Sequence, residues 1–151
     1  MQADVSIAAF SSDAVLYQPD MMDAEVRRVF EKEIGASHPG LVCGRFRPSG
    51  GIDCAVLMAH REYLEDGAWM LGYLMNADSS APLFFPLEEY GCIKFGAEAF
   101  MRFLPRSELV PFGESAPVQM PGDGFEVVFS GHTSHGYFWD NGVLRKVYTS
   151  D

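Results

Sequence analysis

The sequence predicts an α+β domain: a twisted antiparallel sheet or small sandwich with one amphipathic helix packed on it. Two hairpin patterns and one helical pattern carry this prediction. Residues 41–58 consist of two apolar arms around a glycine-rich loop, and the C-terminal segment turns at Asn141-Gly142, the strongest short hairpin signal. Apolar positions between residues 20 and 35 recur at helical spacing. With 151 residues, 48% of them hydrophobic, we expect a single domain over residues 1–151 with a sizeable core.

The first hairpin has the sequence LVCGRFRPSGGIDCAVLM, whose central proline and glycines are typical of a turn. A four-residue loop, Arg47–Gly50, would pair Phe46 with Gly51 and Cys43 with Cys54. Opposed cysteines can form a disulfide when their Cβ atoms lie roughly 4 Å apart. Two small buried thiols are the alternative, and the sequence leaves both open.

The helical pattern predicts one amphipathic helix that begins near Asp20 and ends before Gly35. Asp20 can cap it, with Asp23 three residues further on. Its apolar face comprises Met22, Val26, Val29 and Phe30. We expect this face to pack on the sheet, with a partner-binding helix as the alternative.

Further strands are expected between the two hairpins and before the last one. They are Ala68–Met75, Leu83–Leu87, Glu108–Phe112, Val118–Met120 and Phe125–Phe129. Pro82 and Pro86 favour an edge position for the second of these strands, because proline cannot donate to a ladder. Residues 61–67 form a polar connection and residues 76–81 a turn, whereas residues 91–104 fit either a strand pair or a short helix.

Two segments resemble a known family. Residues 44–57, GRFRPSGGIDCAVL, resemble the G-D-F-[DN]-G-D-G-x-x-D-[YFL]-A-V-L hairpin of FG-GAP-type repeats, the blade unit of integrin-like propellers. Residues 136–151, GYFWDNGVLRKVYTSD, are similar to the ending of small, mostly exported bacterial proteins that carry one such hairpin. The resemblance implies export and a hairpin unit, and it names no activity.

The family loop binds calcium through oxygen ligands at alternate positions, since this hard cation takes six to eight oxygens. Here those positions hold Arg45, Arg47 and Ser49, and only Asp53 keeps a carboxylate. Guanidinium groups donate hydrogen bonds and cannot ligate a cation. We therefore expect no calcium here, and we expect Asp53 to pair with Arg45 or Arg47 or to cap the turn. A structural remnant of a calcium-binding blade is one interpretation of the whole chain.

The net charge of the chain limits the classes of partner that it can bind. The chain has 11 Lys and Arg against 21 Asp and Glu, a formal net charge of -10, which argues against nucleic acid, whose phosphates require a basic surface. An acidic surface suits another protein, preferably a basic one. No apolar run approaches the roughly 18 residues of a membrane span. No glycine-rich loop has the spacing of a phosphate-binding loop, so we expect no cofactor.

The compartment is expected to be the periplasm, with the cytoplasm as the alternative. Residues 1–10 do not form a complete signal peptide, but the opening Met-Gln-Ala-Asp resembles the end of a cleaved A-x-A site. The cysteines do not decide the question, because a bridge between Cys43 and Cys54 would leave Cys92 over.

Candidate chemistry is confined to His132 and His135, three residues apart in a glycine-bounded loop. Zinc would need a third and a fourth ligand, for which the sequence offers only His60 or Asp140 as guesses. Ser134 lies beside His135, but adjacency does not build a catalytic triad. We therefore expect no metal site and no enzyme, and we keep a metal-dependent hydrolase as the alternative.

Aromatic residues suggest a binding role. Phe84, Phe85, Tyr90, Tyr137, Phe138 and Trp139 exceed what one face of a thin sheet requires. Aromatic side chains are the usual anchors of protein interfaces, although core packing could absorb most of them. The sequence thus favours a non-catalytic protein-binding domain, with an inhibitor or immunity-type protein of the bacterial envelope as the specific case.

Overall fold

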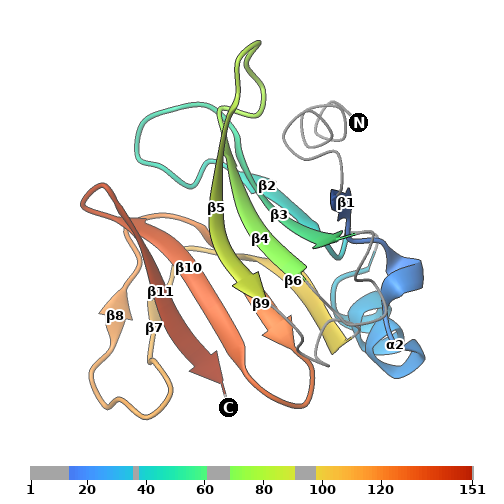
Figure 1. Ribbon diagram of the computed structural model, residues 1–151. Coiled ribbons are helices and arrows are strands. Elements are labelled where there is room, and N and C mark those ends of the chain that lie inside the picture. Colours follow the sequence, from blue (N-terminus) through green and yellow to red (C-terminus); the bar gives the residue numbers. More distant parts are fainter. Residues whose placement is uncertain (1–13, 36–37, 61–68, 91–97, 151) are drawn as a thin grey trace.

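The computed structural model describes residues 14–35, 38–60, 69–90 and 98–150 (Figure 1). It is rich in β-structure, with two large antiparallel sheets, a small hairpin and, within these ranges, a single α-helix. The predicted combination of antiparallel sheet and helix is confirmed at this level, although sheet predominates. No helix in the described ranges has the length and apolar character needed to cross a membrane.

The elements fall into three groups. The five-stranded sheet contains β1 (Ala14–Leu16), β2 (Leu41–Gly44), β3 (Asp53–His60), β4 (Trp69–Met75) and β5 (Leu83–Tyr90). The four-stranded sheet contains β6 (Ala99–Leu104), β9 (Gly124–Phe129), β10 (Ser134–Asp140) and β11 (Val143–Ser150). The remaining elements are the hairpin of β7 (Glu108–Leu109) and β8 (Val118–Gln119), a 3₁₀ turn (Pro19–Met21) and α2 (Ala24–Glu33).

The five-stranded sheet is organised around β3, which pairs with β4 on one edge and with both β2 and β1 along the other. Cys43 lies opposite Cys54, as the sequence predicts. The β2–β3 ladder ends at Gly44 and Asp53, so the predicted pairing of Phe46 with Gly51 does not form. The loop is longer than four residues because the Phe46 side chain turns into the core, where it is 2% exposed.

The four-stranded sheet has the order β11-β10-β9-β6. Asn141 and Gly142 both have positive φ, 49° and 78°, as a two-residue hairpin turn requires, and Asp140 pairs with Val143 across it. The predicted C-terminal hairpin is therefore confirmed. The segment that the sequence left open ends in a strand, β6, which pairs with β9.

The two sheets face each other across one shared apolar core. The five-stranded sheet, called the first sheet below, contributes Leu57, Leu71 and Tyr73 to this core. The four-stranded sheet, called the second sheet, contributes Phe125, Val127 and Tyr137. All are at most 3% exposed. Figure 1 shows the two sheets in this arrangement, and the Lys146 ammonium of β11 donates to the Glu88 carboxylate of β5 at 2.5 Å.

The helix begins later than predicted. Asp20 lies in the 3₁₀ turn that Pro19 opens, and the N-cap is Asp23, whose carboxylate accepts the Glu25 N–H at 2.8 Å. Val26 and Phe30 are buried, and the Phe30 ring packs on Phe100 with centroids 5.5 Å apart. The helix thus packs on the sheet, but Val29, predicted on the same face, is 37% exposed.

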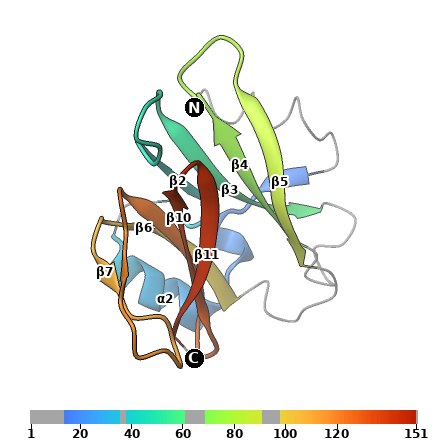
Figure 2. The same ribbon diagram turned by 90° about the vertical axis from the view of Figure 1, so that its left-hand side faces the viewer.

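The β7–β8 hairpin covers the face of the second sheet that points away from the first (Figure 2). Met120 packs there on Phe138 and Val147, and all three are buried. Phe138 is therefore a core residue of this smaller cluster and offers no surface to a partner.

Candidate functional site

A buried ion pair lies where the loop after β2 meets β3. The Asp53 side chain is fully buried and lies against Arg47, one of the two arginines that the sequence offers it. Arg47 donates from Nε to Oδ2 at 2.6 Å and from Nη2 to Oδ1 at 2.8 Å. This two-point geometry is the strongest that a guanidinium and a carboxylate can adopt. Arg45 instead donates to the Gly50 carbonyl oxygen at 3.4 Å.

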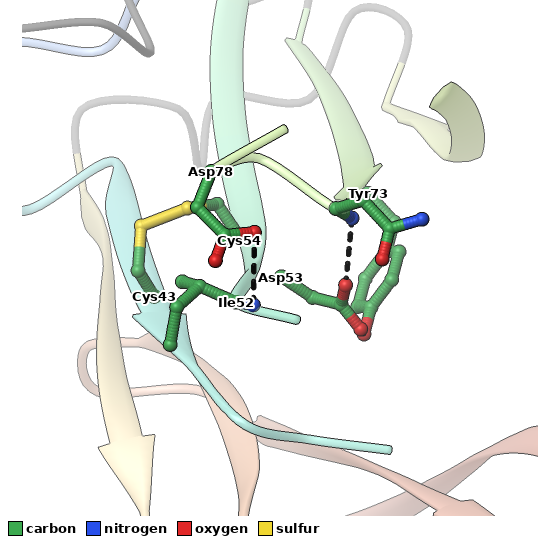
Figure 3. The surroundings of a disulfide bond; sticks show 7 residues. Cys43, Ile52, Asp53, Cys54, Tyr73 and Asp78 are labelled. Atoms are coloured by element: carbon green, nitrogen blue, oxygen red, sulfur yellow. Dashed lines mark hydrogen bonds between the residues drawn. A yellow bond between two sulfur atoms is a disulfide. The ribbon is translucent and has the colours of Figure 1, made fainter. Parts of the chain in front are cut away.

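The same carboxylate accepts hydrogen bonds from β4 and from the turn after it, and Figure 3 shows it beside Tyr73. The Tyr73 hydroxyl donates to Oδ2 at 2.6 Å, and the Asn76 backbone N–H donates to Oδ1 at 2.8 Å. From the second sheet, the Trp139 indole N–H donates to the Tyr73 hydroxyl oxygen at 2.9 Å. A chain of hydrogen bonds therefore runs from Arg47 through Asp53 and Tyr73 to Trp139.

Protonation follows from these contacts. Burial alone would raise the pKa of Asp53, but hydrogen bonds from Arg47, Tyr73 and the Asn76 N–H outweigh burial and hold this pKa below its ordinary value. Burial and the contact with Asp53 raise the pKa of Tyr73. Asp53 is therefore an anion and Tyr73 a neutral hydroxyl that donates to it.

A disulfide joins Cys43 to Cys54, next to Asp53 (Figure 3). The two residues lie directly opposite each other in the β2–β3 ladder, with their Cα atoms 4.1 Å apart. Beside it the Asp78 carboxylate accepts the Ile52 N–H at 3.2 Å. Of the two states that the sequence left open, the structure has the bridge. It closes the loop that carries Arg47.

The two histidines lie in different environments. His132 is exposed and pairs with Glu98 at 2.9 Å, whereas His135 is buried against the rings of Phe129 and Tyr148. Burial, and secondly the charge of Lys146, lower the pKa of His135.

No group of three His, Cys, Asp or Glu side chains gathers within the described ranges. Of the guessed further ligands, Asp140 pairs with Arg145 at 3.0 Å, and the His60 side chain lies outside the described residues. The described residues thus provide no ligand set around His132 and His135.

The aromatic candidates separate into buried and exposed groups. Tyr137 is 3% exposed and stacks on Phe125 with centroids 4.9 Å apart, so it anchors the core instead of a partner. Trp139 is half-buried, and its indole N–H donates to the Tyr73 hydroxyl. Phe84 is partly buried against a second apolar cluster of the first sheet, which includes Val56 and Leu74. Phe85 is 44% exposed.

The remaining aromatic candidate, Tyr90, is the last residue of β5. Its side chain lies outside the described residues.

An apolar surface that the sequence did not single out lies on the segment between β7 and β8. We call residues 107–119 the arm. Val110 and Phe112 of the arm are each 57% exposed, and Tyr148 of β11 is 54% exposed. The Phe112 N–H donates to the Tyr148 carbonyl oxygen at 2.8 Å, which fixes the arm beside β11. The available signal was the pairing of apolar residues with a proline, Val110-Pro111-Phe112, in a segment without Lys or Arg.

Comparisons of the chain with protein-family models, with curated proteins and with solved structures give no match. The resemblance to FG-GAP-type hairpins therefore stays a prediction. In its described ranges the protein is a disulfide-bonded, mainly antiparallel β structure with one α-helix and a buried Arg47–Asp53 pair.

Proposed function

We propose that this protein is a non-catalytic protein-binding domain that binds a basic protein through the arm and Tyr148. One observation carries the proposal: Val110, Phe112 and Tyr148 are each more than half exposed, and a backbone hydrogen bond from Phe112 to Tyr148 fixes the arm beside β11. Exposed apolar groups that cluster on a surface mark interaction sites more often than scattered ones do. Large apolar and aromatic residues at the centre of a patch supply most of the binding energy of an interface.

Charge supports a basic partner. The arm carries Glu108 and Glu114 and has neither Lys nor Arg, within a chain of net charge -10. Both glutamates are exposed, so they place negative charge on the arm, while the Lys146 ammonium lies over the Tyr148 ring at 5.6 Å. Acidic groups at the rim of an interface accelerate encounter with a basic partner and select against acidic ones.

We also propose that the protein is located in the periplasm, and the disulfide supports this location. The Cys43–Cys54 bridge has one exposed cysteine, and such bonds persist in oxidising compartments such as the periplasm. A small, acidic binding domain with a disulfide is consistent with an inhibitor or immunity-type protein of the bacterial envelope. The inhibitor or immunity-type role is inferred from size, charge and the disulfide, whereas the binding role of the arm is inferred from the exposure of specific side chains.

The test is capture of partners from an envelope extract of the source organism by three proteins. They are the wild type, the arm variant Val110→Ser/Phe112→Ser, and a matched control, Leu83→Ser/Phe85→Ser, which removes exposed apolar groups from β5. We expect one stoichiometric, basic protein to stay bound to the wild type and the control through a salt wash and to be lost from the arm variant. Loss from the β5 variant alone would place the binding surface on the other sheet and contradict the proposal.

A further inference from the structure

A pocket of about 350 Å³ lies between the loop after β2 and the base of the arm. It is distinct from the proposed partner surface, and Arg47 of the ion pair with Asp53 forms part of its lining. The charged and aromatic groups that line it are Arg45, Arg47, Arg106, Asp123 and Trp139. Pockets of this size hold small molecules.

The pocket concentrates positive charge in an acidic protein. Three of the chain's 11 basic residues line it, against one of its 21 acidic residues. Arg47 is neutralised by Asp53. Within the described residues neither the Arg45 nor the Arg106 guanidinium pairs with a carboxylate, since Arg45 donates only to the Gly50 carbonyl and Arg106 bonds Asp123 through its backbone N–H at 2.8 Å. The guanidinium groups of Arg45 and Arg106 thus remain for a ligand, and the negative charge of Asp123 offsets part of their positive charge.

An aromatic side chain that is fixed in place also lines the pocket. Trp139 lines it, and the indole N–H is engaged by the Tyr73 hydroxyl, which Asp53 holds in turn. Because this chain of bonds sets the orientation of the indole, its ring is available for stacking without a large loss of side-chain freedom. The buried ring of Phe46 also borders the pocket.

We propose that this pocket binds a small organic anion in which a carboxylate or phosphate is attached to a planar apolar group. A guanidinium offers donors in a fixed fork that matches the oxygens of either anion. Arg45 and Arg106 would hold the anionic group, and Trp139 would stack on the planar part. The site acts independently of the arm.

Titration calorimetry at low ionic strength tests this with benzoate, phenyl phosphate and inorganic phosphate as probes. We expect saturable one-to-one binding of benzoate or phenyl phosphate to the wild type, with inorganic phosphate weaker than phenyl phosphate because it lacks the ring. Arg45→Gln/Arg106→Gln should weaken binding by about tenfold or more, as expected for the loss of charge-assisted hydrogen bonds. The matched control is Arg28→Gln on α2, an exposed arginine that reaches only the Ala24 carbonyl, and it should bind as the wild type does.

Three results would overturn the proposal: no saturable binding of benzoate or phenyl phosphate at millimolar concentration, equal binding by the double variant, or equal weakening in the Arg28→Gln control. Phosphate binding as strongly as phenyl phosphate would overturn the role of Trp139. Circular dichroism checks that the double variant is folded, and the two single variants replace it if it is not. The arm variant Val110→Ser/Phe112→Ser should bind the anion normally, so failure of partner binding and failure of anion binding are distinguishable.

Discussion

Arg47 donates to both oxygens of the Asp53 carboxylate, at 2.6 and 2.8 Å, and this carboxylate is fully buried. The pair joins an otherwise irregular loop to the first residue of β3. Arg47 also donates to the Asn76 side-chain oxygen at 2.7 Å, so it links this loop to the turn after β4. Removing one partner of such a pair is costly because it leaves the other charge buried and unpaired.

Arg47→Met should therefore lower the free energy of unfolding by about 3 kcal/mol or more, because Asp53 would lose its charged partner while Tyr73 and Asn76 remain. Urea denaturation followed by circular dichroism measures the change. The double variant Arg47→Met/Asp53→Asn, which removes both charges, should recover part of the loss. A loss below about 1 kcal/mol in the single variant would show that the pair is no more important than an exposed one.

Calcium should not stabilise the protein. The Arg47 guanidinium occupies both oxygens of Asp53, the single carboxylate in the loop segment 45–53, and a second cation there would be repelled. Thermal denaturation with excess calcium and with a chelator should give the same Tm, with magnesium as the control for ionic strength. A Tm raised by micromolar calcium would contradict this prediction.

Reduction of the Cys43–Cys54 disulfide should lower the free energy of unfolding by about 2–3 kcal/mol, the value expected from chain entropy for a short closed loop. The oxidised protein and the double variant Cys43→Ala/Cys54→Ala are compared by thermal denaturation in the presence and absence of reductant. The variant, which keeps Cys92, should be insensitive to reductant. Equal stability of the two proteins without reductant would contradict the prediction.

His135 should make stability fall at mildly acidic pH. Burial lowers its pKa in the folded state, with a further contribution from Lys146 and an opposing one from Glu88. The unfolded chain binds the proton more readily, so stability is complete above the unfolded pKa of about 6.5 and is lost as pH falls towards the folded pKa. The free energy of unfolding, measured by urea denaturation between neutral pH and pH 5, should have a smaller slope against pH in His135→Phe than in the wild type. The same slope in wild type and His135→Phe would rule out this residue as the cause.

Local patterns predicted much of the fold. The Asn141-Gly142 turn and the register of Cys43 opposite Cys54 depend only on residues close in sequence, and the structure has both. The helix was predicted, but its cap was misplaced, because Asp20 and Asp23 are both good caps and Pro19 decides between them by opening a 3₁₀ turn.

Long-range packing explains what could not be predicted. Tyr137 and Phe138 are neighbours on opposite faces of β10, so a sheet with one solvent face would expose one of them. Both are buried because the first sheet covers one face and the β7–β8 hairpin covers the other. Val110 and Phe112, by contrast, are each 57% exposed, although the Phe112 N–H bonds the edge strand β11. Nor could sequence decide between Arg45 and Arg47 as the partner of Asp53, because both lie within the same loop.

The most direct test of the central claim is calorimetric titration of the purified captured partner into the wild type and into Val110→Ser/Phe112→Ser. The account predicts one-to-one binding to the wild type that weakens by about tenfold or more in the variant, because two exposed apolar anchors are lost. A partner that binds the two proteins equally, or the absence of any stoichiometric partner, would contradict a binding role for the arm.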